Sequence, residues 1–241
     1  MTTTKRSPFV RSFYVANVME IFERFAGYGF FTVSSLYLTT PLTQGGLGFS
    51  EQQRGIIQGL VPFFLYLLPV ITGALGDRYG YRKMFIASFI VMVPSYFLLG
   101  QAKGFWSFLF VFMAVAVGAA MFKPLVVGTV SRTTDDTNRG LGFGIFYTMV
   151  NLGGFLGPIL AGAVRAISWN LVFVSAAAWI AVNFIPAIFF YRDPPSGEDE
   201  PPTTSLGQVL LEAQEVLGNG RLALVVIPLL ILLMIGGGGW M

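Results

Sequence analysis

The amino-acid sequence predicts an all-α polytopic membrane protein. Of its 241 residues, 54% are hydrophobic and only 11% are charged, whereas ordinary soluble domains carry about 25% charged residues. Apolar runs long enough to cross the roughly 30 Å hydrocarbon core as helices recur along the chain. The sequence contains neither cysteine nor histidine, which excludes disulfides, the usual zinc sites and histidine-based proton transfer.

Seven apolar runs of spanning length account for most of the sequence. They cover residues 12–40, 52–75, 83–102, 105–129, 140–164, 169–191 and 221–241. The connections between the first six are short, so successive helices are expected to run antiparallel. Ser50 and Gln53 form a capping-box pattern before the second run. Prolines inside the runs predict kinks there, among them Pro62, Pro69, Pro94, Pro186 and Pro228.

The sequence divides into three expected segments. Residues 1–191 form a six-helix N-terminal transmembrane bundle, and residues 221–241 form the first helix of a truncated C-terminal bundle. Between them, residues 192–220 form a cytoplasmic linker, because residues 192–205 are polar and proline-rich and the residues after them have the spacing of a short amphipathic helix. Most lysines and arginines outside the runs lie on the side of the N-terminus, which places that side in the cytoplasm. We expect no nucleic-acid partner.

Three charged residues interrupt the first apolar run. Glu20 and Arg24 are four residues apart and Glu20 and Glu23 are three apart, so a helix places all three on one face with an internal ion pair. An unpaired charge at the centre of a membrane costs about 2.5–3.5 kcal/mol. The alternative interpretation is an ion pair that only fixes helix packing, but this cost favours a functional site that faces protein or water.

A fourth charge, Lys123, lies near the end of the fourth run. Together the two glutamates and two cations sum to zero formal charge, which a low-dielectric interior requires. Burial favours the neutral form of a carboxyl group, and a nearby cation favours its ionised form. Uptake of a proton by one carboxylate would therefore free a cation to find another partner, which is the physical outline of a proton-coupled switch.

A second distinctive stretch is the turn at residues 73–83. If this turn only set the membrane topology, its basic residues Arg78, Arg82 and Lys83 would be explained. Asp77 and three glycines would not be. At a helix C-terminus Asp77 opposes the helix dipole, so we expect a cationic partner, which is Arg78, Arg82 or a helix N-terminus elsewhere. A string of small residues at 153–162 permits close helix packing or has a gating role.

Four stretches of the sequence resemble those of a known family. The turn at 73–83 resembles the loop between helices two and three of major facilitator superfamily transporters. Residues 20–25, 122–124 and 146–153 resemble, in the same order, three motifs of its proton-dependent oligopeptide transporter family. The resemblance implies two six-helix bundles, alternating access, and symport of protons with small peptides or peptide-like solutes. The partners implied are the substrate, the lipid bilayer of the cell inner membrane and a missing C-terminal six-helix bundle.

The resemblance also implies residue roles. Proton coupling would rest on Glu20, Glu23, Arg24 and Lys123, with Lys123 pairing with the carboxylates. The substrate would be bound by Arg24, Tyr28, Lys123, Tyr147 and Asn151. Gating would rest on Gly73, Gly76, Asp77, Arg78, Gly80 and Arg82. Protons are the coupling ion, and no cofactor or metal is expected.

Three departures from the family pattern bear on peptide recognition more than on proton coupling. Gly27 and Tyr28 stand where two tyrosines are usual, Phe31 stands where many members carry a second arginine, and Leu125 replaces a usual polar residue. The string at 153–162 also resembles the Gly-Pro motif of drug/proton antiporters, which keeps an antiporter as an alternative.

Other classes of protein also have to be weighed. A transport-inactive half-length membrane protein is a further alternative. A sensor or scaffold would carry an appended soluble domain, and an intramembrane enzyme would need a nucleophile or metal set. The sequence shows neither pattern, so we do not expect an enzyme.

Overall fold

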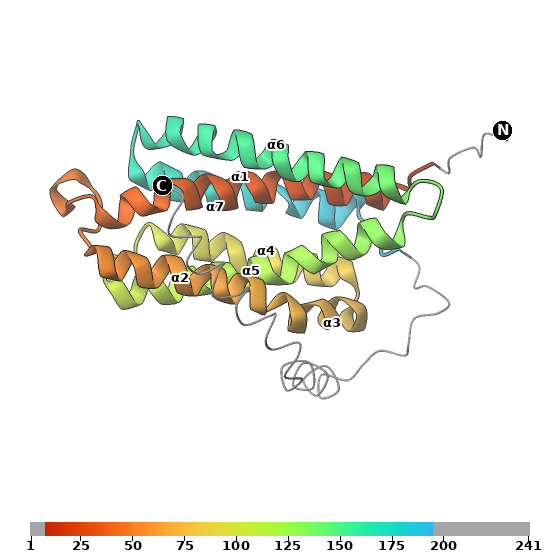
Figure 1. Ribbon diagram of the computed structural model, residues 1–241, viewed down its shortest axis with the longest axis horizontal. Helices are drawn as coiled ribbons and strands as arrows, with labels where there is room; N and C mark the ends of the chain where they lie inside the picture. Colours follow the sequence, from red (N-terminus) through yellow and green to blue (C-terminus); the bar gives the residue numbers. More distant parts are fainter. Residues whose placement is uncertain (1–7, 195–241) are drawn as a thin grey trace, which may run out of the picture.

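The computed structural model describes residues 8–194, which fold into an all-helical bundle (Figure 1). The elements are α1 (Arg11–Thr39), the 3-10 helix η1 (Leu42–Gln44), α2 (Glu51–Leu67), α3 (Pro69–Tyr79), α4 (Tyr81–Leu99), α5 (Phe105–Arg132), α6 (Arg139–Arg165), α7 (Trp169–Val182) and the π-helix η2 (Pro186–Phe190). Each of the six predicted runs up to residue 191 is helical, but the second is divided into α2 and α3 and the sixth into α7 and η2. The amphipathic helix and the seventh run, 221–241, lie outside the described residues.

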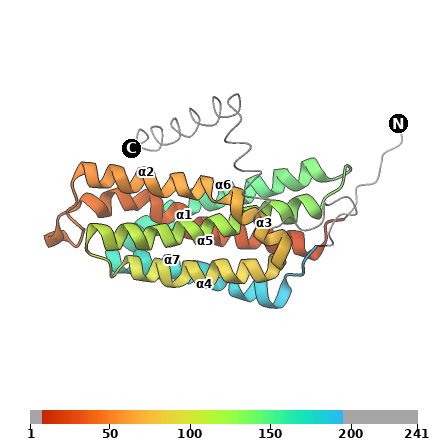
Figure 2. The same cartoon turned by 90° about the horizontal axis from the view of Figure 1, so that it is seen from below.

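The bundle is organised around α1. This helix packs along α6 and α7 and also contacts α2 and α5, while α4 packs against α5 and α7. Successive long helices run antiparallel, so η1 and the α4–α5 and α6–α7 turns share one end of the bundle (Figures 1 and 2). The α3–α4 turn, the α5–α6 loop and η2 share the other, which we call the Arg11 end. The charges of the first apolar run therefore lie in the middle of the molecule.

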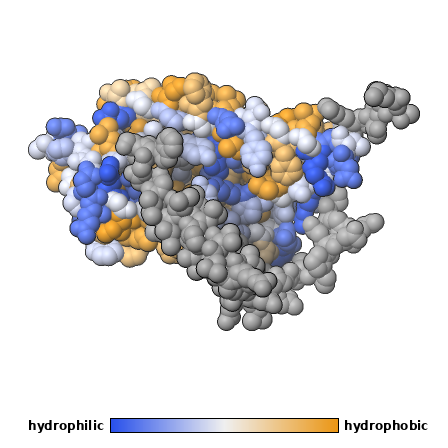
Figure 3. Space-filling view, in the orientation of Figure 1, coloured by the Kyte–Doolittle hydropathy of each residue, from blue (hydrophilic) through white to orange (hydrophobic). Residues whose placement is uncertain are grey.

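The bundle has the dimensions and surface of a membrane protein. Within residues 8–194, α4, α5, α6 and the stretch Trp169–Phe190 are long and apolar enough to cross a membrane, and α2 with α3 would be a fifth, bent span. Large apolar side chains such as Phe110 and Phe155 are about two-thirds exposed, which suits contact with lipid. Figure 3 shows apolar side chains over much of the face in view. α1, with 29 residues, is long enough to span but carries charges at its centre.

The local signals in the sequence explain where helices begin and bend. Ser50 and Gln53 cap α2 reciprocally, as the pattern predicts. Pro69 lacks an amide hydrogen, so α2 ends before it and α3 continues with a bend of 41°. Gly80 separates α3 from α4 with φ of +89°, a conformation that side chains other than glycine rarely adopt. Residues 73–83 were expected to form a turn, but 73–79 continue α3 and 81–83 begin α4, so the sharp turn at the Arg11 end is Gly80 alone.

Candidate functional site

The three charges on α1 form one buried ion cluster. Arg24 Nε lies 2.8 Å from Glu20 Oε1, and Arg24 Nη2 lies 2.8 Å from Glu23 Oε2. The two glutamates are each 2% exposed and the arginine is 7% exposed. The predicted pairing of Glu20 with Arg24 along one helix face is confirmed, and the same guanidinium also holds Glu23.

The cluster is close-packed but not fully hydrogen-bonded. Arg24 Nε and Glu23 Oε2 make no hydrogen bond within residues 8–194, although each lies 2.8 Å from an opposite charge. Short distances with poor alignment leave most of the Coulomb attraction but lose the directional contribution. The guanidinium can therefore give up one carboxylate at less cost than in a fully bonded pair.

Helix α6 holds Arg24 in place through glycines. A Cβ atom at Gly153 would overlap the Arg24 side chain, and one at Gly157 would lie 3.0 Å from the Arg24 carbonyl oxygen. On the facing helix, a Cβ at Gly29 would lie 2.8 Å from the Gly157 carbonyl oxygen. The small residues at 153–162 thus serve close packing of α6 on α1, as one of the two interpretations of the sequence predicts.

We expect Gly153→Ala to destabilise the bundle by about 1–3 kcal/mol, because the added methyl group forces α6 away from Arg24. Gly144 on the same helix faces open space and provides the matched control. Gly144→Ala should be neutral or stabilise by up to about 1 kcal/mol, because alanine favours helix. Unfolding of both variants in mixed detergent micelles measures the difference, and equal stability of the two would refute this account of the α1–α6 contact.

Helix α7 and Asn183, the residue that follows it, contact α1 next to the cluster. Asn183 is fully buried, and its Nδ2 donates a hydrogen bond of 3.1 Å to the carbonyl oxygen of Met19, the residue before Glu20. Trp179 stacks on Phe22 and packs edge-on against Phe25. Sequence reasoning did not identify Asn183, although an asparagine inside an apolar run is a usable signal.

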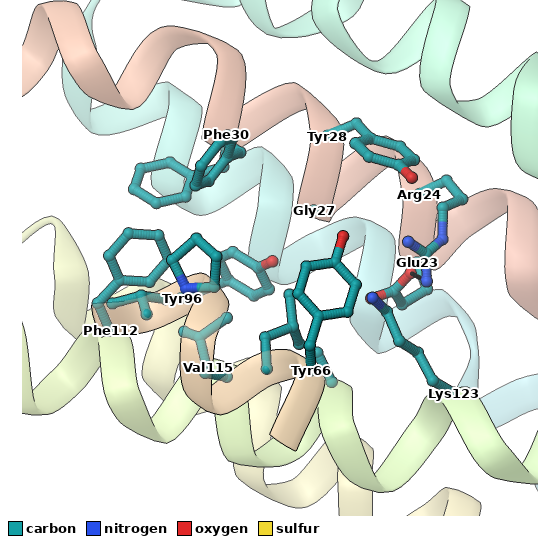
Figure 4. A pocket seen from close by; sticks show the side chains of 16 residues that line it. Glu23, Arg24, Gly27, Tyr28, Phe30, Tyr66, Tyr96, Phe112, Val115 and Lys123 are labelled. Atoms are coloured by element: carbon teal, nitrogen blue, oxygen red, sulfur yellow. Dashed lines mark ion pairs between the residues drawn. The ribbon is translucent and has the colours of Figure 1, made fainter. Parts of the chain in front are cut away.

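A cavity of about 620 Å³ opens beside the cluster (Figure 4). Helices α1, α2, α4 and α5 contribute its walls. The lining residues are Glu23, Arg24, Gly27, Tyr28, Phe30, Phe31, Val61, Pro62, Leu65, Tyr66, Tyr96, Phe112, Val115, Ala116, Ala119 and Lys123. Charged groups gather at one end and aromatic and aliphatic groups at the other, while Glu20 is buried and does not line the cavity.

Lys123 shares this cavity but does not pair with a carboxylate. Its Nζ lies 4.6 Å from the centre of the Tyr66 ring, and within residues 8–194 it makes no ion pair. The expected direct ion pair of Lys123 with the glutamates is not formed within the described residues, and the role of Lys123 in proton coupling stays a prediction. The half-buried amine points toward the end of the cavity where Glu23 and Arg24 lie (Figure 4), so it contributes to the same electrostatic site across open space.

Some of the residues expected to bind substrate line the cavity and others do not. Tyr28 lines the cavity, and the Arg24 guanidinium carbon lies 5.1 Å from its ring centre. Tyr147 and Asn151 do not line this cavity, because α6 exposes both on its outer side. Tyr66 and Tyr96, by contrast, line it and were not identified from the sequence. Tyrosines within apolar runs are the signal that would have found them.

The end of α3, the turn at Gly80 and the start of α4 are fixed by partners from distant parts of the chain. Asp77 Oδ1 lies 3.0 Å from Arg132 Nη2 on α5 and accepts a hydrogen bond of 3.0 Å from the Tyr81 hydroxyl. We expected the partner of Asp77 to be Arg78, Arg82 or a helix N-terminus, but in the structure it is Arg132. Arg78 instead stacks on the ring of Tyr79. Gly76 is buried where a Cβ would overlap Leu125, and Gly73 lies against Pro124.

Arg82 ties this turn to the end of the bundle's last helix. Its guanidinium donates hydrogen bonds to the carbonyl oxygens of Ala187 and Ile188 in η2, and its backbone amide donates to Asp193 Oδ1 at 2.7 Å. A Cβ at Gly80 would lie 2.9 Å from the other Asp193 oxygen. Arg82 thus satisfies carbonyl groups of η2, and Asp193 satisfies a backbone amide in the first turn of α4.

An antiparallel bundle of membrane helices that encloses an ion cluster beside a cavity is the architecture of a polytopic membrane transporter. The sequence matches the model of the Major Facilitator Superfamily over residues 24–241. The chain therefore belongs to the Major Facilitator Superfamily, which is a family of transporters and not of enzymes.

Curated relatives and solved structures agree with this assignment. The chain is 29% identical over 179 residues to the uncharacterized transporter YclF of Bacillus subtilis (strain 168), covering 73% of this chain and 36% of the relative. It is 28% identical over 178 residues to the di-/tripeptide transporter of Lactococcus lactis subsp. lactis (strain IL1403), covering 71% and 35%. The crystal structure of the peptide transporter POT (E310Q mutant) with alafosfalin superposes with a TM-score of 0.71 at 26% identity, covering 91% of this chain and 46% of that one. The chain thus spans about a third of these relatives and under half of the solved transporter.

Proposed function

We propose that the chain is the N-terminal half of a proton-coupled symporter for small peptides or peptide-like solutes in the cell inner membrane. The observation that carries this proposal is the Glu20–Arg24–Glu23 cluster, of which Glu23 and Arg24 face the cavity. In this proposal α1 to η2 form six crossings with the N-terminus in the cytoplasm. A six-helix C-terminal bundle completes the transporter, with residues 192–220 as linker and residues 221–241 as its first helix.

Coupling would follow from competition for Arg24. A proton on Glu23 removes one of the two negative charges that hold the guanidinium, which then prefers a carboxylate of the substrate in the cavity. Lys123, which has no carboxylate partner in the described residues, would bind the same substrate group from across the cavity. Release of the proton restores the Glu23–Arg24 pair and displaces the substrate. Each step exchanges one partner of a buried cation for another, so no charge is left uncompensated.

Substrate contacts would be shared between the two bundles. Arg24, Tyr28 and Lys123 would bind from within the cavity. Tyr147 and Asn151 lie on the exposed side of α6, where the proposed second bundle would pack, and would contact the substrate at that interface. The peptide specificity rests in part on residues beyond the described chain.

Transport by the whole protein in proteoliposomes tests the proposal. With an inward proton gradient, a labelled dipeptide should accumulate above its outside concentration, and a protonophore should abolish the accumulation. The alternative is a drug/proton antiporter, which is favoured by the apolar side chains that line the cavity, such as Phe30, Phe112 and Ala119. Under the same inward gradient, efflux of a preloaded apolar cation without dipeptide uptake would select it. Failure of both assays would contradict a proton-coupled transporter.

Asp77→Asn should change conformational cycling rather than substrate affinity, because the Asp77–Arg132 pair lies at the Arg11 end and away from the cavity. A partly exposed ion pair is worth about 0.2–1 kcal/mol, which shifts a two-state equilibrium up to roughly fivefold. Cysteine-accessibility rates on the two sides of the membrane measure that shift. Arg132→Gln should shift it in the same direction, and a loss of substrate affinity with unchanged cycling would contradict the gating role of Asp77.

A further inference from the structure

A second cavity of about 620 Å³ lies at the end of the bundle opposite the Arg11 end. It is formed where η1 and the α4–α5 and α6–α7 turns meet (Figures 1 and 2). The residues that line it are Tyr37, Gln44, Gly45, Gly100, Gln101, Lys103, Ser168, Trp169, Asn170 and Phe173. It shares no lining residue with the cavity beside Glu23, and the proton-coupling proposal does not use it.

The lining is rich in hydrogen-bond donors and carries positive charge. Lys103 is exposed into it and donates a hydrogen bond of 3.2 Å to the Tyr37 hydroxyl, but it makes no ion pair within residues 8–194. Side-chain amides of Gln44, Gln101 and Asn170 add further donors, and none of the described residues that line the cavity is a carboxylate. Such a set of groups selects an anion.

Neighbouring groups increase the positive potential. Helix α7 begins at the cavity with Ser168 as its N-cap, so the positive end of its dipole faces the same space. The Arg165 guanidinium carbon lies 4.7 Å from the centre of the Trp169 ring. In the described segments that meet at this end, 40–54, 100–104 and 165–170, Glu51 is the sole carboxylate, and it pairs with Arg54 at 2.7 Å.

The cavity also has a built aromatic floor. Tyr37 is 1% exposed, and its ring packs against Trp169 and Phe173 at centroid distances of 5.0 and 4.9 Å. Two glycines keep the space open, because a Cβ at Gly100 would lie 3.0 Å from the Phe173 ring and one at Gly45 would lie 3.2 Å from Trp169. The volume falls within the range of small-molecule sites, about 300–1,000 Å³, and exceeds what a bare oxyanion needs.

We propose that this cavity binds a phosphate group, carried by the headgroup of an anionic phospholipid. The phosphate would contact Lys103 and the amides, and the polar remainder of the headgroup would lie on the Tyr37–Trp169 floor. A lipid is favoured over a free ion because the cavity lies at the helix ends, and because Trp106 and Phe110, in the first two turns of the helix that follows Lys103, are about two-thirds exposed. Exposed aromatic residues at helix ends are typical of the membrane–water interface.

Fluorescence of Trp169 tests the site in the whole purified protein in neutral detergent. Dioleoylphosphatidylglycerol should change the emission saturably, dioleoylphosphatidylcholine should not, and Trp169→Phe should remove the response. Lys103→Gln should weaken binding roughly tenfold or more, the loss expected for a charge-assisted hydrogen bond. Lys103→Arg should retain it. Asn170→Leu, which removes an amide donor and keeps the cation, should weaken binding by a smaller factor.

Arg54→Gln is the matched control, because Arg54 is a cation at the same end that does not line the cavity. It should bind the lipid like the parent protein. Saturable binding of inorganic phosphate that competes with the lipid and depends on Lys103 would support the oxyanion site and identify the free ion as its ligand. Equal responses to both lipids, a response to neither lipid nor phosphate, or one unchanged in Lys103→Gln would overturn the proposal.

Discussion

Glu23→Gln is expected to abolish uptake driven by a proton gradient while leaving exchange of substrate without a gradient. Glutamine keeps the size of the side chain but cannot take up or release a proton. Of the two buried glutamates, Glu23 lines the cavity and Glu20 does not. Glu23 is therefore the carboxyl group that water and substrate reach. Driven uptake should fall to the level of protein-free liposomes.

Counterflow of labelled against unlabelled dipeptide is the measurement that separates coupling from binding. Counterflow in the Glu23→Gln variant should persist, because Arg24 and Lys123 remain to bind a carboxylate. Glu20→Gln is the informative companion, since Glu20 is equally buried but does not line the cavity. Full driven uptake by Glu23→Gln would remove Glu23 from the coupling role.

Arg24→Ala should destabilise the bundle by about 3–5 kcal/mol, because it leaves Glu20 and Glu23 buried without their shared cation. Arg54→Ala provides the contrast. Arg54 pairs with Glu51, whose side chain is 72% exposed, and a pair of that kind contributes about 0.2–1 kcal/mol.

Unfolding in mixed micelles at neutral pH measures both arginine variants. Replacing all three charges together, as in Glu20→Gln, Glu23→Gln, Arg24→Leu, should recover much of the lost stability, because no unpaired charge is then left buried. Similar losses in the two single arginine variants would contradict the burial argument.

Much of the fold follows from local signals that a single sequence carries. Helix limits follow from run length, from the Ser50 cap and from Pro69 and Gly80, each of which acts on its own neighbours. The Glu20–Arg24 pair was predictable for the same reason, because residues four apart on a helix must be adjacent. These inferences need no knowledge of how helices rotate against one another.

What the sequence could not predict depends on that rotation. Arg132 is 55 residues from Asp77, and nothing local distinguishes it from Arg78 or Arg82 as a partner. Lys123 shares the cavity with the glutamates, but the way α5 packs on α1 leaves its amine over Tyr66 instead of on a carboxylate. Asn183 was missed because its role depends on how the end of α7 packs on α1, and the aromatic lining was missed because it depends on four helices meeting.

Infrared difference spectroscopy of the whole transporter, recorded on addition of a dipeptide, tests the central claim most directly. The claim is that a buried carboxyl group beside Arg24 changes its protonation when substrate binds. A band of a protonated carboxylic acid should appear in the parent protein and be absent from Glu23→Gln. A substrate-induced spectrum without any carboxylic acid band, or with one that persists in both Glu23→Gln and Glu20→Gln, would contradict it.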